Sequence, residues 1–192
     1  MQEDDFAVRL QQIVQNTLEI DIPQFSNMNA ATGRKLKQLM ALIAENVPFK
    51  PNFSKLATAL AVSRNNIADY CLFIEEAGLI AQLRDSIGSF GILGKVEKVY
   101  LENTNLLYSL ASKNANIGTV RETFFLNQLR LNHNITASPV SDFEIEGMTF
   151  EIGGRNKEQK QIQSAKCGFV VKDNIEIGYE NIIPLWHFGM MY

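Results

Sequence analysis

The chain has 192 residues, of which 46% are hydrophobic, and its formal net charge at pH 7 is −3. This length suits one domain of ordinary size or two small ones, and the hydrophobic content is enough for packed cores. No run approaches the roughly 18 apolar residues of a membrane span, and the acidic start MQEDD lacks the positive region of a signal peptide. We therefore expect a folded cytoplasmic protein with no membrane partner.

Cysteine and histidine offer little for the common metal and nucleophile sites. Cys71 and Cys167 form no C-x-x-C pair, and we expect both to be small buried residues without a disulfide. With only His133 and His187, a histidine-based zinc site or a Ser-His-Asp triad has little to draw on. Each histidine is expected to be structural or exposed.

Charge is unevenly distributed along the chain. Residues 1–32 carry −4, with one Arg against five acids, and residues 33–101 carry +3, with nine Lys and Arg against six acids. The remainder carries −2, with eight basic residues against ten acids. The basic excess in the middle is mild, because a dedicated nucleic-acid binder usually shows a strong basic stripe.

The first predicted elements are two helices joined by a polar connector. Apolar residues recur at three- and four-residue intervals over residues 4–18, which predicts a helix capped by the aspartates at its start. Pro23 is expected to end the run that follows, and residues 23–32 to form the connector. A second helix is expected over residues 33–45, before Pro48.

Residues 52–78 have the pattern of a helix-turn-helix. Two helices flank a turn at residues 61–63, Ser63 is a good N-cap for the second helix, and Gly78 is a suitable C-terminal glycine. Strands expected over residues 79–83 and 95–101, joined by a flexible segment, would add a β-wing. This unit can contact DNA or pack against another domain, and its charge does not decide between the two. The residues expected to reach the major groove and the phosphates are Arg64, Asn65, Asn66, Lys95 and Lys98.

A glycine-rich stretch at residues 88–95 does not qualify as a phosphate-binding loop. One residue too many separates Gly88 from Gly94, and Val96 stands where Ser or Thr is required. We therefore expect no ATPase activity from this chain.

The second half alternates predicted helices and strands. The T-x-x-E pattern at Thr119 and Glu122 is typical of a capping box, which would explain Glu122 as a structural residue. The expected helices cover residues 103–113, 119–131 and 156–165, and the expected strands cover residues 134–140, 167–171 and 182–188, the last of which can also be an extended tail.

Residues 141–157, SDFEIEGMTFEIGGRNK, alternate apolar and polar residues on both sides of a glycine, which predicts a β-hairpin. A two-residue loop at Gly147 and Met148 would place Glu144 opposite Glu151, with Asp142 diagonal to it. Like charges this close need water, a cationic side chain or a bound cation. The face is therefore either a solvated acidic surface or a Mg²⁺ or Mn²⁺ site able to act on a phosphodiester.

The order of these elements resembles the restriction-endonuclease-like PD-(D/E)xK fold. Several segments are similar to the C-terminal half of a large prokaryotic family of AAA-type ATPases, whose terminal region is a domain of unknown function: SRNNIADYCLFIEEAGLI, KVYLENTNLLYSL, GTVRETFFLNQL, FEIGGRNKEQKQI and IPLWHFGMMY. The resemblance implies a mixed α+β or α/β chain. It would comprise a connector from a missing ATPase core at residues 1–32, a winged helix-turn-helix at residues 33–101 and an αβββαβ nuclease-like domain at residues 102–192. ATP would bind only in the missing N-terminal domain, which would be a partner in the same protein.

The resemblance also implies a site. Asp142 and Glu151 would hold Mg²⁺ or Mn²⁺, while the usual motif lysine falls on Gly153. Arg155 or Lys157 could reach the same place, although an Arg cannot serve as a base. The implied catalytic positions are Glu122, Asp142, Glu151, Arg155, Lys157 and Gln161.

Two functions follow from these observations. The first is a binding module for nucleic acid, with DNA preferred over RNA, or for a protein partner, attached to an AAA-type ATPase and carrying an inactive or weak nuclease-like site. The second is a metal-dependent DNA or RNA phosphodiesterase. The missing lysine at Gly153 favours the binding module.

Overall fold

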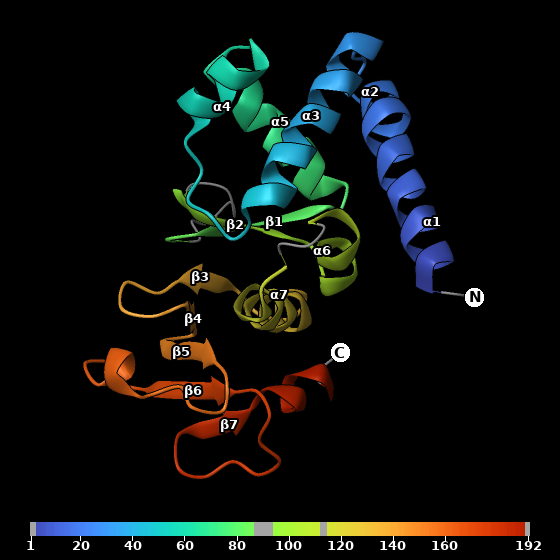
Figure 1. Cartoon of the computed structure of the whole chain (residues 1–192). Helices are drawn as coiled ribbons and strands as arrows, with labels where there is room; N and C mark the ends of the chain where they lie inside the picture. The colour runs from blue at the N-terminus through green and yellow to red at the C-terminus, as the bar shows by residue number, and fades with distance from the viewer. Residues whose placement is uncertain (1–2, 87–93, 112–114, 191–192) are drawn as a thin grey trace. The chain divides into compact units, whose positions relative to one another are not determined.

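The computed structural model describes residues 3–86, 94–111 and 115–190, which form α-helices and two β-sheets (Figure 1). The expected mixed α+β class is confirmed. Contacts divide the chain into two units. The helical unit consists of Met1–Gln82 and Val99–Ala115, and the sheet unit consists of Leu83–Lys98 and Asn116–Tyr192. Within the described residues, no helix has the length and apolar character needed to span a bilayer.

The helical unit begins with a longer helical run than the sequence predicts. Helix α1 (Glu3–Asn16) continues through a π-helical turn (Thr17–Asp21) into α2 (Ile22–Phe25). The expected end at Pro23 is wrong, because the helical run continues through this proline, which lies just after the π-helical turn and whose fixed φ is compatible with a helix. Helix α3 (Ala30–Asn46) also starts earlier than expected, since the Asn29 side chain accepts a hydrogen bond from the Thr32 amide.

The next two helices lie where they are predicted. Helix α4 (Phe53–Leu60) ends at Ala61, which has a left-handed conformation, and α5 (Arg64–Glu76) begins after Ser63, whose hydroxyl accepts from the Asn66 amide. Gly78 follows α5 with φ +70°, as a C-terminal glycine should.

Two strands and a short helix follow α5. Strands β1 (Ile80–Arg84) and β2 (Val96–Leu101) pair in a two-stranded sheet, and α6 (Thr104–Leu110) is capped by Asn103. The glycine-rich stretch between the two strands falls largely outside the described residues.

Helix α7 (Ile117–Leu129) opens the larger part of the sheet unit, and its cap differs from the expected one. The Asn116 side chain accepts a hydrogen bond from the Thr119 amide at 2.9 Å. Thr119 is therefore inside the helix, where it is buried, and the predicted capping box with Glu122 is wrong. The pattern failed because Asn is at least as good an N-cap as Thr and lies where the first turn can form.

Asn116→Ala should therefore lower the free energy of unfolding by about 1 kcal/mol, the usual value of an N-cap. Urea denaturation followed by circular dichroism would measure it. Ile117→Ala, at an exposed position beside the cap, is the control and should change the free energy of unfolding by less than about 0.5 kcal/mol. A loss in Asn116→Ala no larger than the loss in Ile117→Ala would contradict this assignment of the cap.

A five-stranded mixed sheet follows α7, in the order β3-β4-β5-β6-β7. Its first three strands are antiparallel, while β5 pairs with β6 and β6 with β7 in parallel. Helix α7 packs on β5, the central strand (Figure 1). The strands are β3 (Ile135–Ala137), β4 (Phe143–Ile145), β5 (Met148–Gly153), β6 (Gly168–Lys172) and β7 (Ile182–Pro184).

The β4–β5 hairpin forms, but the predicted register is wrong. Glu144 pairs with Thr149 and not with Glu151. The two loop residues are Glu146 and Gly147, both with positive φ (51° and 81°), as in a type I′ turn. The shift preserves the sorting of faces, because side chains alternate with period two. Glu151 still points away from the face that carries Phe150.

The polar helix predicted over residues 156–165 is absent from the structure, which has only a 3-10 turn there (Lys160–Ile162). This segment has one buried apolar side chain, Ile162, which packs with Val170 and Ile182. A helix with no apolar stripe has little to bury, so tertiary contacts decided its conformation. A second 3-10 helix (Leu185–Met190) ends the described chain.

Aromatic rings form the centre of the sheet unit. Phe125 of α7 is fully buried, and its ring centroid lies 5.2 Å from that of Phe143, 5.4 Å from that of Phe150 and 4.8 Å from that of Phe188. This cluster joins α7, both hairpin strands and the terminal 3-10 helix. It thereby fixes the elements that carry the acidic residues.

The cysteines are both free, but only one matches its expected burial. Cys71 is buried in α5, whereas Cys167 is exposed just before β6. The prediction for Cys167 is wrong because the buried strand begins one residue later.

Candidate functional site

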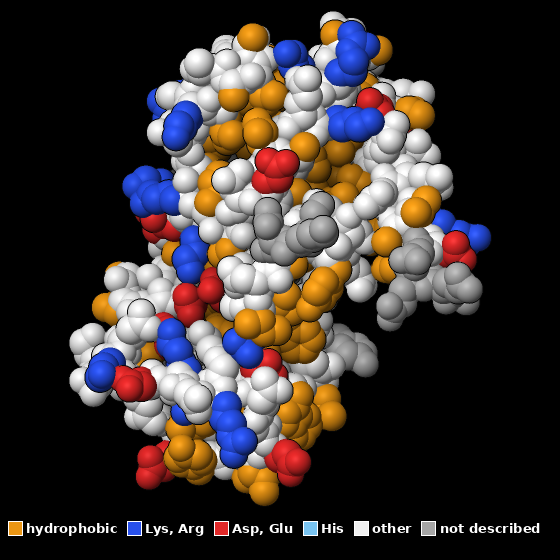
Figure 2. All heavy atoms as spheres, viewed as in Figure 1, with side chains coloured by type: hydrophobic (Ala, Val, Ile, Leu, Met, Phe, Trp, Pro, Cys, Tyr) orange, Lys and Arg blue, Asp and Glu red, His pale blue; other side chains and the backbone are white. Residues whose placement is uncertain are grey.

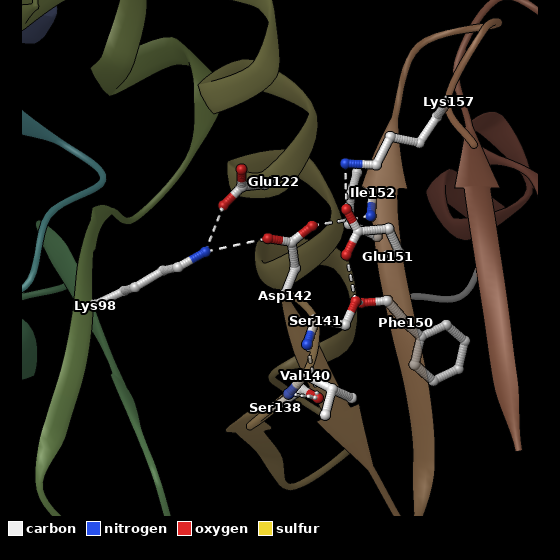
Figure 3. A network of polar contacts seen from close by, with 10 residues as sticks. All are labelled: Lys98, Glu122, Ser138, Val140, Ser141, Asp142, Phe150, Glu151, Ile152 and Lys157. Atoms are coloured by element: carbon white, nitrogen blue, oxygen red, sulfur yellow. Dashed lines mark hydrogen bonds and ion pairs between the residues drawn. The ribbon is translucent and has the colours of Figure 1, made fainter. Parts of the chain in front are cut away.

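Glu122 lies on α7, and its carboxylate points toward Lys98. The Lys98 ammonium is 3.3 Å from Oε2 of Glu122 and 3.1 Å from Oδ1 of Asp142 (Figure 3). All three side chains are mostly buried, with exposed fractions of 33% for Lys98, 18% for Glu122 and 16% for Asp142. Glu122 therefore belongs to a charge network and not to a helix cap.

Lys98 remains a cation in this environment. Its burial alone would lower its pKa, but the negative charges of Glu122 and Asp142, and its hydrogen bonds to them, raise the pKa above the ordinary value. A protonated ammonium cannot accept a proton, so Lys98 is not a general base at neutral pH. The sequence predicts that Lys98 reaches phosphates from a wing; in this structure its ammonium is held by two carboxylates.

Asp142, which directly precedes β4, is held in one orientation. Its Oδ2 accepts a hydrogen bond from the Ile152 amide of β5 at 3.0 Å, while its Oδ1 accepts from Lys98. The turn before it is fixed by Ser138, whose hydroxyl accepts from the Val140 and Ser141 amides (Figure 3). The carboxylate is therefore positioned by a backbone amide on one side and by the Lys98 ammonium on the other.

Glu151, in the centre of β5, is only 2% exposed. Its Oε2 accepts a hydrogen bond from the Ser141 hydroxyl, and its Oε1 forms an ion pair with Lys157 (Figure 3). A solvated acidic face is thus the wrong interpretation for this residue. Burying a carboxylate is costly unless it is paired, and the two partners supply that pairing.

Lys157 reaches Glu151 across Gly153. A Cβ atom placed on Gly153 would lie 2.5–2.6 Å from the Cβ, Cγ and Cδ atoms of Lys157, so the lysine stem fills the space that a side chain at Gly153 would need. The chain returns through a turn in which the Lys157 amide donates to the Gly154 carbonyl at 2.9 Å. The ammonium of a later residue therefore lies beside the second acid, although the sequence has glycine at the motif position.

Three other candidate residues are exposed and take no part in the described contacts of this network. Arg155 and Gln161 are exposed, and they are not among the residues whose contacts join Asp142 and Glu151 in the described part of the chain. Lys95 is exposed and forms an ion pair with Glu97 at 3.3 Å.

The side chains at the start of α5 are exposed in the helical unit. Arg64 and Asn65 project from the first turn, while the Asn66 side chain accepts from the Ser63 hydroxyl in the cap. On the face seen in Figure 2, Lys and Arg side chains are dispersed among polar and apolar ones. This agrees with the mild basic excess of the sequence.

The first part of the chain matches a known protein family. Residues 1–117 match the model of a family described as a domain of unknown function, DUF8612. The chain belongs to the DUF8612 family. No curated protein and no solved structure matches it. The DUF8612 match includes Lys98 but ends before Glu122, so the family model does not extend over the acids of the site.

Two further residues of this DUF8612 protein support the site but carried no signal in the sequence. The folding of the hairpin brings the Ser141 hydroxyl to Glu151, a contact that depends on the tertiary structure. Arg121 donates from Nε to Oδ2 of Asp173 at 3.0 Å, and its terminal nitrogens lie 3.3 Å from the position that a Cβ on Gly154 would take. A cation thus lies beside the glycine turn that positions Lys157.

The donor set suits a hard divalent cation. Asp142 and Glu151 offer carboxylate oxygens, each with one oxygen fixed by a neutral donor and the other held by an ammonium. The described residues contain no group of three or more His, Cys, Asp or Glu side chains arranged to hold a metal. Mg²⁺ is often held by only one or two carboxylates, with water and substrate phosphate completing its shell, so two carboxylates fit this ion.

Proposed function

We propose that the sheet unit is a divalent-cation-dependent phosphodiesterase domain that acts on nucleic acid. The observation that carries the proposal is the position of Lys157, whose stem lies over Gly153 and whose ammonium pairs with Glu151. Absence of the motif lysine was the reason to expect an inactive site. Lys157, which follows Gly153 by four residues, places an ammonium beside Glu151 and removes that reason.

The roles follow from the contacts. Asp142 and Glu151 would hold Mg²⁺ or Mn²⁺, which when bound supplies Lewis-acid stabilisation at a phosphodiester oxygen. Lys157 is held beside Glu151, where its charge can stabilise negative charge that develops on the phosphate. Ser141 and the Ile152 amide orient the two carboxylates, so little reorganisation is needed when substrate binds.

The nuclease-like fold belongs to the same proposal. Helix α7, the β3-β4-β5 meander and the parallel strand β6 follow the order expected of a PD-(D/E)xK domain, with a 3-10 turn where the second helix was expected. We further propose that α4, α5 and the β1–β2 pair form a winged helix that positions DNA through Arg64 and Asn65. An attached AAA-type ATPase, cytoplasmic and ATP-binding, remains part of the proposal on the resemblance alone.

A non-catalytic binding module is the second candidate. Lys98 and Lys157 already neutralise most of the charge of the three acids, so the network is stable as a structural feature without any metal. In that case nucleic acid or a protein partner would bind at the exposed start of α5. Metal would be irrelevant.

Calorimetric titration with Mn²⁺, run beside cleavage assays on single- and double-stranded DNA and RNA, separates these functions. We expect the wild-type protein to bind Mn²⁺, and Asp142→Asn to weaken binding at least tenfold because it removes one charged ligand. Cleavage should fall with it. Glu144→Gln is the matched control on the same hairpin and should change neither quantity.

Two outcomes would contradict the phosphodiesterase. One is the absence of Mn²⁺ binding at millimolar concentration. The other is cleavage that persists unchanged in Asp142→Asn. Binding of DNA that is lost in Arg64→Ala and unaffected by Asp142→Asn, without any cleavage, would instead establish the binding module.

A further inference from the structure

Lys98 comes from a different part of the chain than the rest of the network, and its ammonium lies on the acid that the proposed function assigns to metal. It is contributed by β2, within the separate segment Leu83–Lys98 of the sheet unit. Asp142 has one oxygen committed to the Ile152 amide, and the ammonium takes the other at 3.1 Å. Both oxygens of this carboxylate therefore already accept a hydrogen bond before a metal binds.

The two lysines of the network are held differently. Lys157 has its stem packed over Gly153 and pairs with the buried Glu151, so it is fixed by packing as well as by charge. Lys98 is held by its ammonium contacts with Glu122 and Asp142. The exposed fractions of the two side chains, 33% for Lys98 and 31% for Lys157, are similar, so the difference between them lies in the contacts of the Lys157 stem. Of the two, Lys98 is the one that can exchange its anionic partners for others from solution.

We propose that Lys98 competes with the divalent cation for Asp142 and that a nucleic-acid phosphate relieves this competition by drawing the ammonium away. The inference rests on the proposed function and adds to it a coupling between substrate binding and metal binding. An ammonium and a divalent cation repel each other at neighbouring positions in a partly buried site, so each weakens the binding of the other to Oδ1 of Asp142. A phosphate of the substrate offers Lys98 an equivalent anionic partner.

The coupling has a reciprocal form. If phosphate releases Asp142 for the metal, then bound metal must raise the affinity for the polyanion by the same factor. The protein alone would thus bind Mn²⁺ weakly, and the protein with nucleic acid would bind it tightly. Such a site would bind metal more weakly before substrate is present than after it.

Mn²⁺ titration of Lys98 variants tests the competition. Lys98→Met keeps most of the stem without the charge, and we expect it to bind Mn²⁺ at least tenfold more tightly than the wild-type protein. Lys98→Arg should resemble the wild type, and so should Lys95→Met, the control on the neighbouring exposed lysine. Lys98→Gln provides a second neutral variant, and circular dichroism confirms that each variant is folded.

The coupling is measured with a fluorescently labelled, hydrolysis-resistant DNA oligonucleotide. Fluorescence anisotropy should show that saturating Mn²⁺ increases the affinity of the wild-type protein for the oligonucleotide about tenfold. This factor should be smaller in Lys98→Met, where only the direct contact between metal and phosphate contributes. A factor that is unchanged in the variant would overturn the proposal.

The outcomes separate this inference from the function on which it rests. If the two neutral variants bind Mn²⁺ no more tightly than the wild type, while Asp142→Asn binds it more weakly, the role of Lys98 is refuted and the metal site stands. If neither the wild type nor Lys98→Met binds Mn²⁺, both proposals fail.

Discussion

Lys157→Ala should lower the cleavage rate by about a hundredfold to a thousandfold, which is the usual loss when one preorganised charge-stabilising donor is removed from an active site. Adding Gly153→Lys to that variant should restore part of the rate. The reason is steric: the Lys157 stem occupies the space above Gly153, and truncation at residue 157 removes its Cγ and Cδ atoms. The Cβ that remains at residue 157 would lie 2.6 Å from a Cβ at residue 153, so the turn must shift slightly to admit the new side chain. A lysine placed there would have a short path to Glu151.

Single-turnover cleavage at saturating Mn²⁺ would measure the rates, with thermal unfolding to confirm that each variant is folded. Lys160→Ala is the control, because Lys160 is exposed and pairs with Glu158 on the surface. Gly153→Lys alone should be impaired, since the two stems would compete for one space. A folded double variant no faster than Lys157→Ala would show that the position of the lysine, and not its presence, is what the site requires.

Phe125→Ala should destabilise the sheet unit by about 3–5 kcal/mol, the usual cost of removing a buried aromatic ring. The ring is fully buried and contacts those of Phe143, Phe150 and Phe188, so its loss leaves a cavity bounded by three separate elements. Because α7 also carries Glu122, the charge network should loosen and metal binding should weaken together with stability.

Urea denaturation followed by circular dichroism would give the free energy of unfolding. Ile117→Ala, at an exposed position of the same helix, should change it by less than about 0.5 kcal/mol. A change below about 1 kcal/mol for Phe125→Ala would contradict the packing described for this core.

Local signals predicted the helical part of the fold well. Ser63 and Gly78 act through the backbone of their own helix ends, so their roles can be found from a few neighbouring residues. The hairpin was predicted for the same reason, but its register depends on the turn. Glu is an unusual residue for the first position of a type I′ turn, where Asn and Asp are preferred, so the pattern pointed to the wrong pair of loop residues.

The candidate site was only partly predictable, because its contacts are long-range. The acids could be named from the hairpin pattern and the resemblance. The partners of Asp142 and Glu151 could not be named from the sequence, since Lys98 is 44 residues from Asp142. Lys157 was one of two candidates for the missing lysine, and its placement depends on the turn after Gly153, in a segment whose sequence favoured a helix. In that segment, packing and charge outweigh the local helix propensity.

The route of the chain limits how the protein can be divided. Leu83–Lys98 belongs to the sheet unit although the helical unit continues on both sides of it, in Met1–Gln82 and Val99–Ala115. No single proteolytic cut can therefore release either unit whole. A fragment expressed from residue 116 onward would keep Glu122 and Asp142 without the ammonium that neutralises them. The metal affinity and the solubility of such a fragment would reflect a site that lacks the Lys98 charge, and they would differ from those of the intact protein.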